Sequence, residues 1–146
     1  MSRHFTLIEA EQLLPAVEAD IREAIALKSQ FEEAEAEWQH FSRRIMLMGG
    51  VAVDHSRIMD QKNQRESCAL RLKETIEKIH EHGCLVKDLD MGLIDFPTLF
   101  HGEEVYLCWK LGESGIRFWH GVHEGFGGRK PIDREFLEHH QGEIPN

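Results

Sequence analysis

The sequence predicts an α+β protein in which a long antiparallel helical hairpin is followed by a small, mostly antiparallel β-sheet and a short C-terminal segment. Two observations support this class. Through residues 7–82 apolar side chains recur every three or four positions, which is the period of one helix face. After Gly83 the period changes to two, and turn residues separate short apolar runs, as in strands. We expect a single domain, 1–146, with the hairpin at about 7–82 and the β-rich part at about 84–131.

The first helix is expected to begin near Leu7. Thr6 and Glu9 have the spacing of a capping box, in which each side chain accepts a hydrogen bond from the backbone of the other residue. Pro15 predicts a kink or a fresh helix start near Leu14, because proline cannot donate to the preceding turn. One apolar stripe then continues along the helix. It consists of Val17, Ile21, Ala24, Leu27, Phe31, Ala34, Trp38, Phe41, Ile45 and Met48.

The second helix is expected over about residues 56–82. Gly49–Gly50 predicts the end of the first helix, and Asp54 and Ser56 are both suitable caps for the next one. An antiparallel hairpin would bring basic residues of the second helix close to the acidic run 32–37 of the first. Such ion pairs would help to set the orientation of the helices, although each pair is weak. The basic residues are Arg57, Lys62, Arg65, Arg71 and Lys73.

Four short strands and two further segments are expected after Gly83. The strands are predicted at 84–87, 93–96, 104–110 and 116–120. Pro97 predicts the end of the second strand, because proline cannot donate to a sheet ladder. In the third strand, alternation puts Trp109 on one face and Cys108 on the other. The remaining segments are a glycine-rich loop at 121–131 and a short capped helix or frayed tail at 133–140.

The composition limits which classes of partner and which cellular compartment are expected. The chain has 26 acidic and 17 basic residues, a formal charge of -9, which argues against nucleic acid as a partner because phosphates need clustered cations. No apolar run reaches membrane-spanning length, and the N-terminus lacks the apolar region of a signal peptide, so no membrane association is expected. Three cysteines, a small and odd number, predict free thiols in a reducing cytoplasm.

The most metal-like spacing in the sequence is that of His120, His123 and Glu124. Two imidazoles and a carboxylate within five positions suit a divalent ion such as zinc. The glycines of the 119–129 segment could let the loop bend both rings inward. The alternative interpretation is a chance spacing in a chain that contains 10 histidines. A further ligand could come from Asp88, Asp95, Glu104 or Glu113.

Arg129 is the candidate anion-binding residue. It follows the Gly125–Gly128 segment, whose backbone amides could line an anion pocket, and its guanidinium group could supply a bidentate pair of donors. The alternative is that Arg129 closes the loop by pairing with an acidic residue. The acidic candidates are Asp88, Asp95 and Glu113.

Cys108 has three competing interpretations. It could be a reactive thiol, for which His120 on the neighbouring strand is the obvious base. It could face Cys84 across strands, or it could be a buried free cysteine, which is the commonest role. The sequence leaves these alternatives open.

The aromatic residues of the β-rich part predict a wall at one end of the sheet, made of Trp109, Trp119 and Phe126. Neighbours on a strand face opposite sides, so His120 is expected to point away from the core if Trp119 points into it. A groove beside His120, with an apolar wall and a few polar groups, would have the composition of a small-molecule site.

Several phrases resemble an uncharacterised bacterial family, the domain of unknown function 2203. They are Val86–Asp88, Gly92–Pro97, Glu104–Glu113, Trp119–His120 and Gly125–Arg129, together with the opening Phe5–Leu7 and Leu13–Pro15. The resemblance covers nearly the whole chain. It implies two long helices leading into a small sheet in a cytoplasmic bacterial protein, and it brings no assigned activity or catalytic residues.

Two functions of different classes are expected from the sequence. The first is a non-enzymatic interaction or scaffold module that forms a homo-oligomer, most simply a dimer, through its long helices. The alternative is a small divalent-metal- or anion-binding protein with a site at the 119–129 loop, which could serve as a hydrolase. Whether the protein is an enzyme is left open by the sequence.

Overall fold

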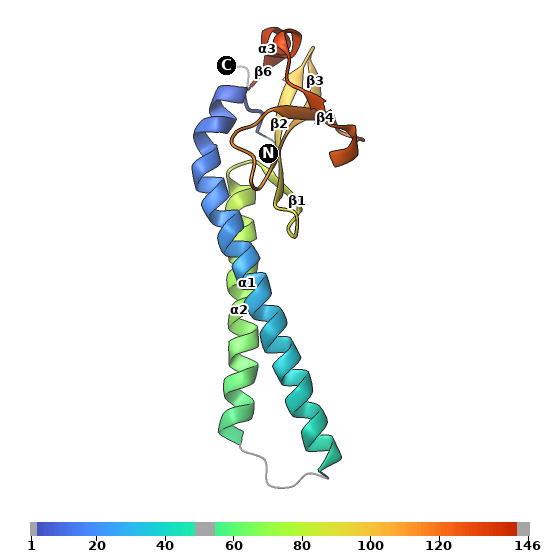
Figure 1. Ribbon diagram of the computed structural model, residues 1–146. Helices are drawn as coiled ribbons and strands as arrows, with labels where there is room; N and C mark the ends of the chain where they lie inside the picture. Colours follow the sequence, from blue (N-terminus) through green and yellow to red (C-terminus); the bar gives the residue numbers. More distant parts are fainter. Residues whose placement is uncertain (1–2, 49–54, 143–146) are drawn as a thin grey trace.

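The computed structural model describes residues 3–48 and 55–142, and it confirms the α+β class (Figure 1). Two long helices form the antiparallel hairpin, and a six-stranded sheet packs beside the end of the hairpin that holds the N-terminus. The helices are α1 (Leu7–Leu47), α2 (His55–Glu81) and the short α3 (Arg134–His139). The strands are β1 (Leu85–Asp88), β2 (Leu93–Phe100), β3 (Glu103–Lys110), β4 (Phe118–Gly121), β5 (Lys130–Pro131) and β6 (His140–Gln141), with a 3-10 turn η1 (Phe126–Gly128) before β5.

Helix α1 begins at Leu7 with the predicted capping box. The Thr6 hydroxyl accepts from the Glu9 amide at 3.2 Å, and the Glu9 carboxylate accepts from the Thr6 amide at 3.0 Å. The helix passes through Pro15 without a break, so no second helix starts there. Losing one backbone hydrogen bond is tolerated because the two turns around Pro15 are anchored by packing on the sheet. The predicted ends at Gly49–Gly50 and the cap at Asp54 lie outside the described residues.

The hairpin is joined by fewer cross-helix charge pairs than the sequence predicts. Arg65 pairs with Glu35 at 3.1 Å, as expected. Arg71 pairs instead with Glu23, at 3.7 Å, because antiparallel helices bring together residues that lie equally far from the turn. Lys73 bonds within its own helix. Arg65 thus pairs with the acidic run as predicted, whereas Arg71 and Lys73 pair with carboxylates outside it.

All strand pairings are antiparallel, in the order β1-β2-β3-β4-β5, with β6 pairing to the far end of β2. Strand β2 does not end at Pro97, as the sequence predicted, but continues to Phe100. The Pro97 carbonyl accepts a hydrogen bond from Phe5, so this residue turns its backbone away from β3. Its missing N–H therefore faces the gap between β1 and β6, where no ladder bond is lost.

The predicted loop at 121–131 also contains more structure than expected. It includes η1 and the two-residue strand β5, which pairs with β4. The C-terminal segment forms the capped helix rather than a frayed tail, because the Asp133 carboxylate accepts from the Phe136 amide at 2.9 Å.

One face of the sheet packs on the hairpin and carries the main core. It presents alternate residues of β2 and β3, among them Phe96, Leu107 and Trp109, to Val17 and Ile21 of α1. All five are fully buried. The opposite face, called here the outer face, carries the intervening residues of the same strands, and it is covered by the 121–129 segment.

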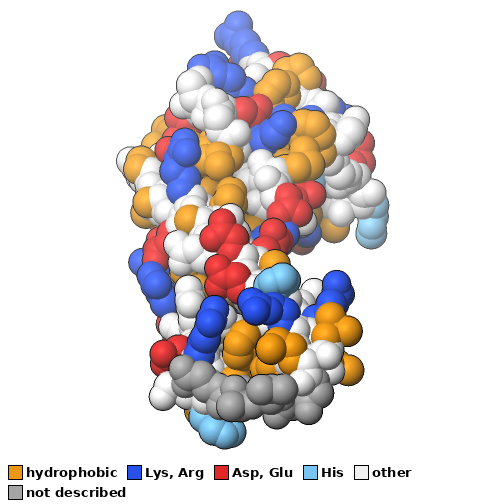
Figure 2. Space-filling view, turned by 60° about the horizontal axis from the view of Figure 1, so that its bottom comes forward, with side chains coloured by type: hydrophobic (Ala, Val, Ile, Leu, Met, Phe, Trp, Pro, Cys, Tyr) orange, Lys and Arg blue, Asp and Glu red, His pale blue; other side chains and the backbone are white. Residues whose placement is uncertain are grey.

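The distal half of the hairpin lies beyond the sheet and projects away from it (Figure 1). Past Leu27, the only buried residue of α1 in the described range is Ala34. Hydrophobic side chains gather instead on the surface close to the tip, flanked by Lys and Arg (Figure 2). Met46 is 82% exposed and Leu47 is 80% exposed. No helix in the two described ranges is long and apolar enough to cross a membrane.

Candidate functional site

Three polar side chains converge on the outer face from three adjacent strands. Asp95 on β2 lies opposite Cys108 on β3, and His120 on β4 lies opposite Tyr106, two residues before Cys108. Because alternate residues share a face, Asp95, Cys108 and His120 all point away from the hairpin. Their ligand atoms lie within 4.8 Å of one another, and theirs is the one such group of three His, Cys, Asp or Glu residues in 3–48 and 55–142.

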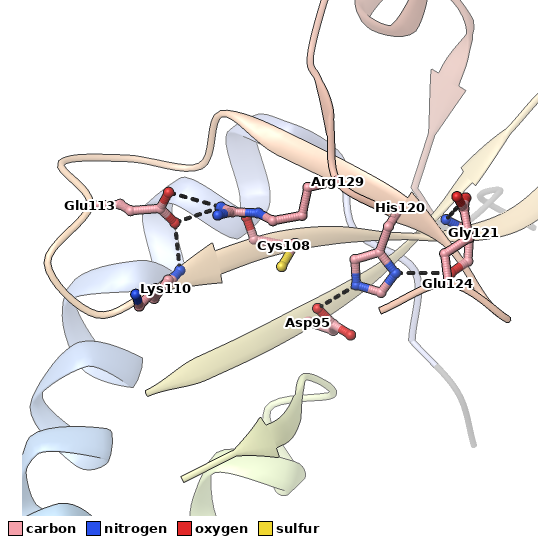
Figure 3. Close-up of polar contacts among 8 residues, drawn as sticks. All are labelled: Asp95, Cys108, Lys110, Glu113, His120, Gly121, Glu124 and Arg129. Carbon is pink, nitrogen blue, oxygen red and sulfur yellow. Dashed lines mark hydrogen bonds and ion pairs between the residues drawn. The ribbon is translucent and has the colours of Figure 1, made fainter. Parts of the chain in front are cut away.

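Hydrogen bonds hold the His120 ring at both nitrogens (Figure 3). Nδ1 lies 2.8 Å from the carbonyl oxygen of Gly121, and Nε2 lies 3.0 Å from Oδ1 of Asp95. A carbonyl oxygen can only accept, so Nδ1 carries a proton. The contact with Asp95 then needs one further proton, shared between Nε2 and Oδ1. The orientation of the ring is thereby set, with Nε2 directed at the carboxylate.

All three side chains of the cluster are buried. Asp95 is 1% exposed, His120 is 2% exposed, and Cys108 is 0% exposed. Burial raises the pKa of the Asp95 carboxyl, and the neighbouring His120, Cys108 and Lys87 partly oppose that rise. Removing a carboxylate from water is costly unless its oxygens are well paired.

The Asp95 carboxylate is only half satisfied. Oδ1 contacts His120, whereas Oδ2 is buried and has no hydrogen-bond partner among the described residues. A buried polar atom without a partner is uncommon in proteins and marks a position that a further group can stabilise. The described structure therefore holds an unfilled acceptor beside an imidazole nitrogen and a thiol.

Cys108 lacks the features of an activated nucleophile. Burial, together with the neighbouring Asp95 carboxylate, raises the pKa of its thiol to about 12, so the thiolate is disfavoured. His120 cannot act as its base in this arrangement, because both ring nitrogens are already engaged. Cys108 also does not face Cys84, which belongs to the core on the hairpin side. Of the three interpretations, a buried free thiol agrees with the structure.

A pocket of about 290 Å³ opens above the cluster. Asp95, His120 and Tyr106 contribute to its lining, and the Tyr106 and His120 rings meet edge-on with centroids 5.6 Å apart. Lys87 and Phe126 line the pocket as well. The sequence left open whether a groove remains beside His120 once Arg129 closes the loop; the structure has both, and an atom placed in the groove could approach two of the three clustered side chains.

Arg129 does not lie over this pocket but closes the loop. Its Nη2 donates to both carboxylate oxygens of Glu113, at 2.7 and 2.8 Å (Figure 3). The Glu113 carboxylate also accepts from the Lys110 amide at 2.6 Å. The guanidinium group packs on the Phe118 ring, 4.1 Å from its centroid. Of the two interpretations of Arg129, pairing with an acidic residue is the one realised here.

His123 and Glu124 are exposed, and neither belongs to the cluster around His120. Glu124 organises the loop: its carboxylate accepts from the Gly121 amide at 2.9 Å and from Lys130 Nζ at 2.6 Å. A Cβ atom on Gly128 would lie 2.8 Å from Glu124, so the tight fit of the loop depends on glycine there. The Lys130 ammonium lowers the pKa of Glu124.

The three aromatic residues that were predicted to form one wall do not lie on one face of the sheet. Trp109 and Trp119 both belong to the hairpin-side face, and Trp119 stacks on Phe136 with ring centroids 5.1 Å apart. Phe126 lies on the other side of the sheet, where it lines the pocket and approaches Lys110 and Arg129. The prediction that His120 and Trp119 face opposite sides is confirmed.

Sequence reasoning found the members of the cluster but not their association. Asp95 appeared as one of four optional extra ligands and as a possible partner of Arg129, and Cys108 appeared as a thiol near His120 or opposite Cys84. The local signal was the alternation in β2 and β3, which puts both residues on the outer face. The missing information was the register, which sets Asp95 directly opposite Cys108.

Comparisons with known proteins give one match. A family model described as an uncharacterised conserved protein, DUF2203, matches residues 3–132. This range includes the hairpin, the strands β1 to β5 and all three clustered side chains. No curated protein and no solved structure shows detectable similarity to the chain.

Proposed function

The chain belongs to the DUF2203 family of uncharacterised conserved proteins, and we propose that it binds a divalent transition-metal ion through Asp95, Cys108 and His120. The observation that carries the proposal is the buried Asp95 carboxylate, which has one orphaned oxygen beside a thiol and an imidazole nitrogen. A carboxylate, a thiolate and an imidazole are donors that zinc accepts, and the thiolate disfavours magnesium and calcium.

The hydrogen bond from His120 Nδ1 to Gly121 supports this assignment. Histidines that bind metals usually donate their other ring N–H to a carbonyl or carboxylate, which fixes the tautomer and aims the free nitrogen at the ion. Here the Gly121 carbonyl, 2.8 Å away, takes that role. A bound cation would replace the proton of the Cys108 thiol, which would be released to solvent, and the thiolate would then be a second anionic donor beside Asp95.

Three protein donors leave a coordination position open, as in zinc sites that bind water or substrate. The pocket of about 290 Å³ gives access to that position from solvent. Hydrolase activity is thus compatible with the site, but metal binding is the proposal.

Metal analysis of untagged protein tests the proposal. After removal of metal by a chelator, the protein should take up one zinc or cobalt ion per chain. Cobalt should produce a thiolate charge-transfer band, which reports the bond to Cys108. Binding should also stabilise the fold by about 2.7 kcal/mol when the free metal is about 100 times Kd. Absence of stoichiometric uptake, with no change in melting temperature, would contradict the proposal.

Self-association through the distal hairpin is a second candidate function. Two packed helices are marginally stable alone, and this part of the hairpin has almost no buried side chains of its own. Met46 and Leu47 are more than three-quarters exposed at 82% and 80%, next to a groove of about 500 Å³ between Glu35 and Leu47. Exposed apolar surface of this kind favours burial against another protein surface.

A second copy of the chain is the partner that the charges favour, through a face of α1 that shares only Leu47 with the groove. Glu33, Glu37, His40, Arg44 and Leu47 are all exposed and lie on one face of α1, since they are spaced by four and three residues in turn. We propose that the α1 helices of two copies pair antiparallel about a two-fold axis that passes between Glu37 and His40. Glu33 of each copy then lies opposite Arg44 of the other, which gives two equivalent ion pairs. Neither Glu33 nor Arg44 forms an ion pair with another described residue. The mass in solution tests this proposal.

We further propose a cytoplasmic location, a bacterial source and no nucleic-acid partner. The three described cysteines are free and buried, which suits a reducing compartment. The bacterial source rests on the family resemblance. A formal charge of -9 disfavours binding to phosphates.

A further inference from the structure

The pocket above Asp95 and His120 has two sides of different chemistry. Lys87 and Tyr106 form the polar side, where the Lys87 ammonium lies 5.0 Å from the centroid of the Tyr106 ring. Met91, Val122 and Phe126 form the apolar side, and all three are exposed although they are large and hydrophobic. Apolar side chains around a concave site with a few polar groups are typical of pockets for small organic molecules.

The Lys87 ammonium lines this pocket and forms no direct ion pair with the described residues, although its charge favours the ionised form of the nearby Asp95. Besides Asp95, two further carboxylates line the pocket, and each accepts hydrogen bonds from the fold. Asp88 caps the turn by accepting from the Met91 amide at 3.0 Å, and Glu124 accepts from Gly121 and Lys130. The polar side of the pocket therefore presents a cation toward an incoming ligand.

A bound metal ion would add to this preference. A divalent cation is neutralised by two anionic ligands, Asp95 and Cys108, while His120 contributes none. A coordination position left open by these three donors would then face a pocket that also holds the Lys87 ammonium. An anionic head group would satisfy both, and an apolar body would cover Phe126 and its neighbours.

On the basis of the metal site proposed above, we infer that the pocket binds a small organic carboxylate with an apolar body. The carboxylate occupies the space between the metal site and Lys87, and the body lies against Met91, Val122 and Phe126. The volume of about 290 Å³ suits a molecule with one ring. Neither half of such a ligand is expected to bind well alone, because each contacts only one side of the pocket.

The cobalt-loaded protein provides a direct test, with phenylacetate as the probe. Its carboxylate should change the visible spectrum of the bound cobalt in a saturable way. Acetate, which has the head group without the ring, should bind about tenfold more weakly, since the ring buries apolar area worth at least ~1.4 kcal/mol. Benzyl alcohol, which has the ring without the charge, should leave the spectrum unchanged.

Two substitutions separate the two sides of the pocket. Lys87→Met should weaken phenylacetate and acetate alike by about fivefold, as expected for a partly exposed charge pair. Phe126→Ala should weaken phenylacetate by about fivefold and leave acetate unchanged. Lys73→Met is the matched control, because Lys73 lies on α2 and pairs only with Glu77 there. Circular dichroism of each variant checks that the fold is retained.

The outcomes distinguish this inference from the metal proposal. If cobalt gives its thiolate band but no carboxylate alters the spectrum, the metal site stands and the ligand assignment is overturned. If phenylacetate binds equally well to metal-free protein, the assignment of its head group to the metal is overturned. If cobalt does not bind at all, both proposals are overturned.

Discussion

His120 and Asp95 are 25 residues apart in sequence, yet Nε2 of one lies 3.0 Å from Oδ1 of the other inside the protein. The contact crosses β3, because β2 and β4 both pair with that strand and neither pairs with the other. The side chains reach each other over Cys108, which lies on β3 between them. The geometry of this pair thus depends on the registers of two separate strand pairings.

We expect metal affinity to depend on this trio and not on the neighbouring loop. Asp95→Asn, Cys108→Ser and His120→Gln should each weaken zinc binding by more than about 100-fold, since each removes a donor and outer-shell changes alone cost 10–100-fold. His123→Ala and Glu124→Gln should bind zinc as the unaltered chain does. Competition with a chromophoric chelator measures the zinc affinity of both sets of variants. The reverse pattern would instead support the ligand set read from sequence spacing.

The Arg129–Glu113 pair should contribute measurably to stability. Its side chains are 11% and 23% exposed, so Arg129→Ala leaves a mostly buried carboxylate without its partner. We expect a loss of about 2 kcal/mol in the free energy of unfolding. Urea denaturation measures it, with Arg134→Ala as control. Arg134 pairs with Glu138 on an exposed helix surface, so its removal should cost less than about 0.5 kcal/mol.

Stability should fall at alkaline pH because of Cys84. Burial raises the pKa of this thiol from 9.0 to about 12, so the unfolded chain releases the proton at lower pH than the native protein. The contribution of Cys84 is therefore complete below about pH 9 and is lost as the pH rises toward about 12. Metal-free protein should lose about 2 kcal/mol more than Cys84→Ala between about pH 9 and about pH 11. Parallel curves for the two proteins would disprove this assignment.

All three cysteines should be reduced in the native protein. Thiol titration in denaturant without reductant should find three free thiols, because each cysteine is free and buried in the structure. Under native, metal-free conditions the same reagent should react slowly at each of them. A count of one would indicate an internal disulfide and would weaken the cytoplasmic assignment.

A charge exchange tests self-association through α1. Light scattering at tens of micromolar should give a dimer for the unaltered chain. Arg44→Glu should weaken the dimer by about tenfold or more, since it opposes like charges at two symmetry-related positions. Adding Glu33→Arg should restore it by reversing both pairs. A strict monomer for the unaltered chain, or no rescue by the double variant, would contradict this arrangement.

Local chemistry was sufficient to predict the features that depend on near neighbours in sequence. Thr6 and Glu9 predicted the start of α1, because the partners of a capping box are only three positions apart. The alternation in β3 predicted that Trp109 and Cys108 would lie on opposite faces, and the same rule placed His120 on the side opposite Trp119. Each of these features follows from the backbone geometry of a few consecutive residues.

The tertiary structure decided which distant residues meet. The sequence put Asp95, Cys108 and His120 on strands, but only the pairing registers bring them together, and a shift of one residue would turn one of them toward the core. Pro97 continues β2 because its nitrogen faces an unpaired gap, which the sequence does not reveal. Arg129 had three acidic candidates, and the path of the 121–129 segment brought it to Glu113. In each case the outcome depends on long-range packing, whose energy is shared among many contacts and is not encoded at any single position.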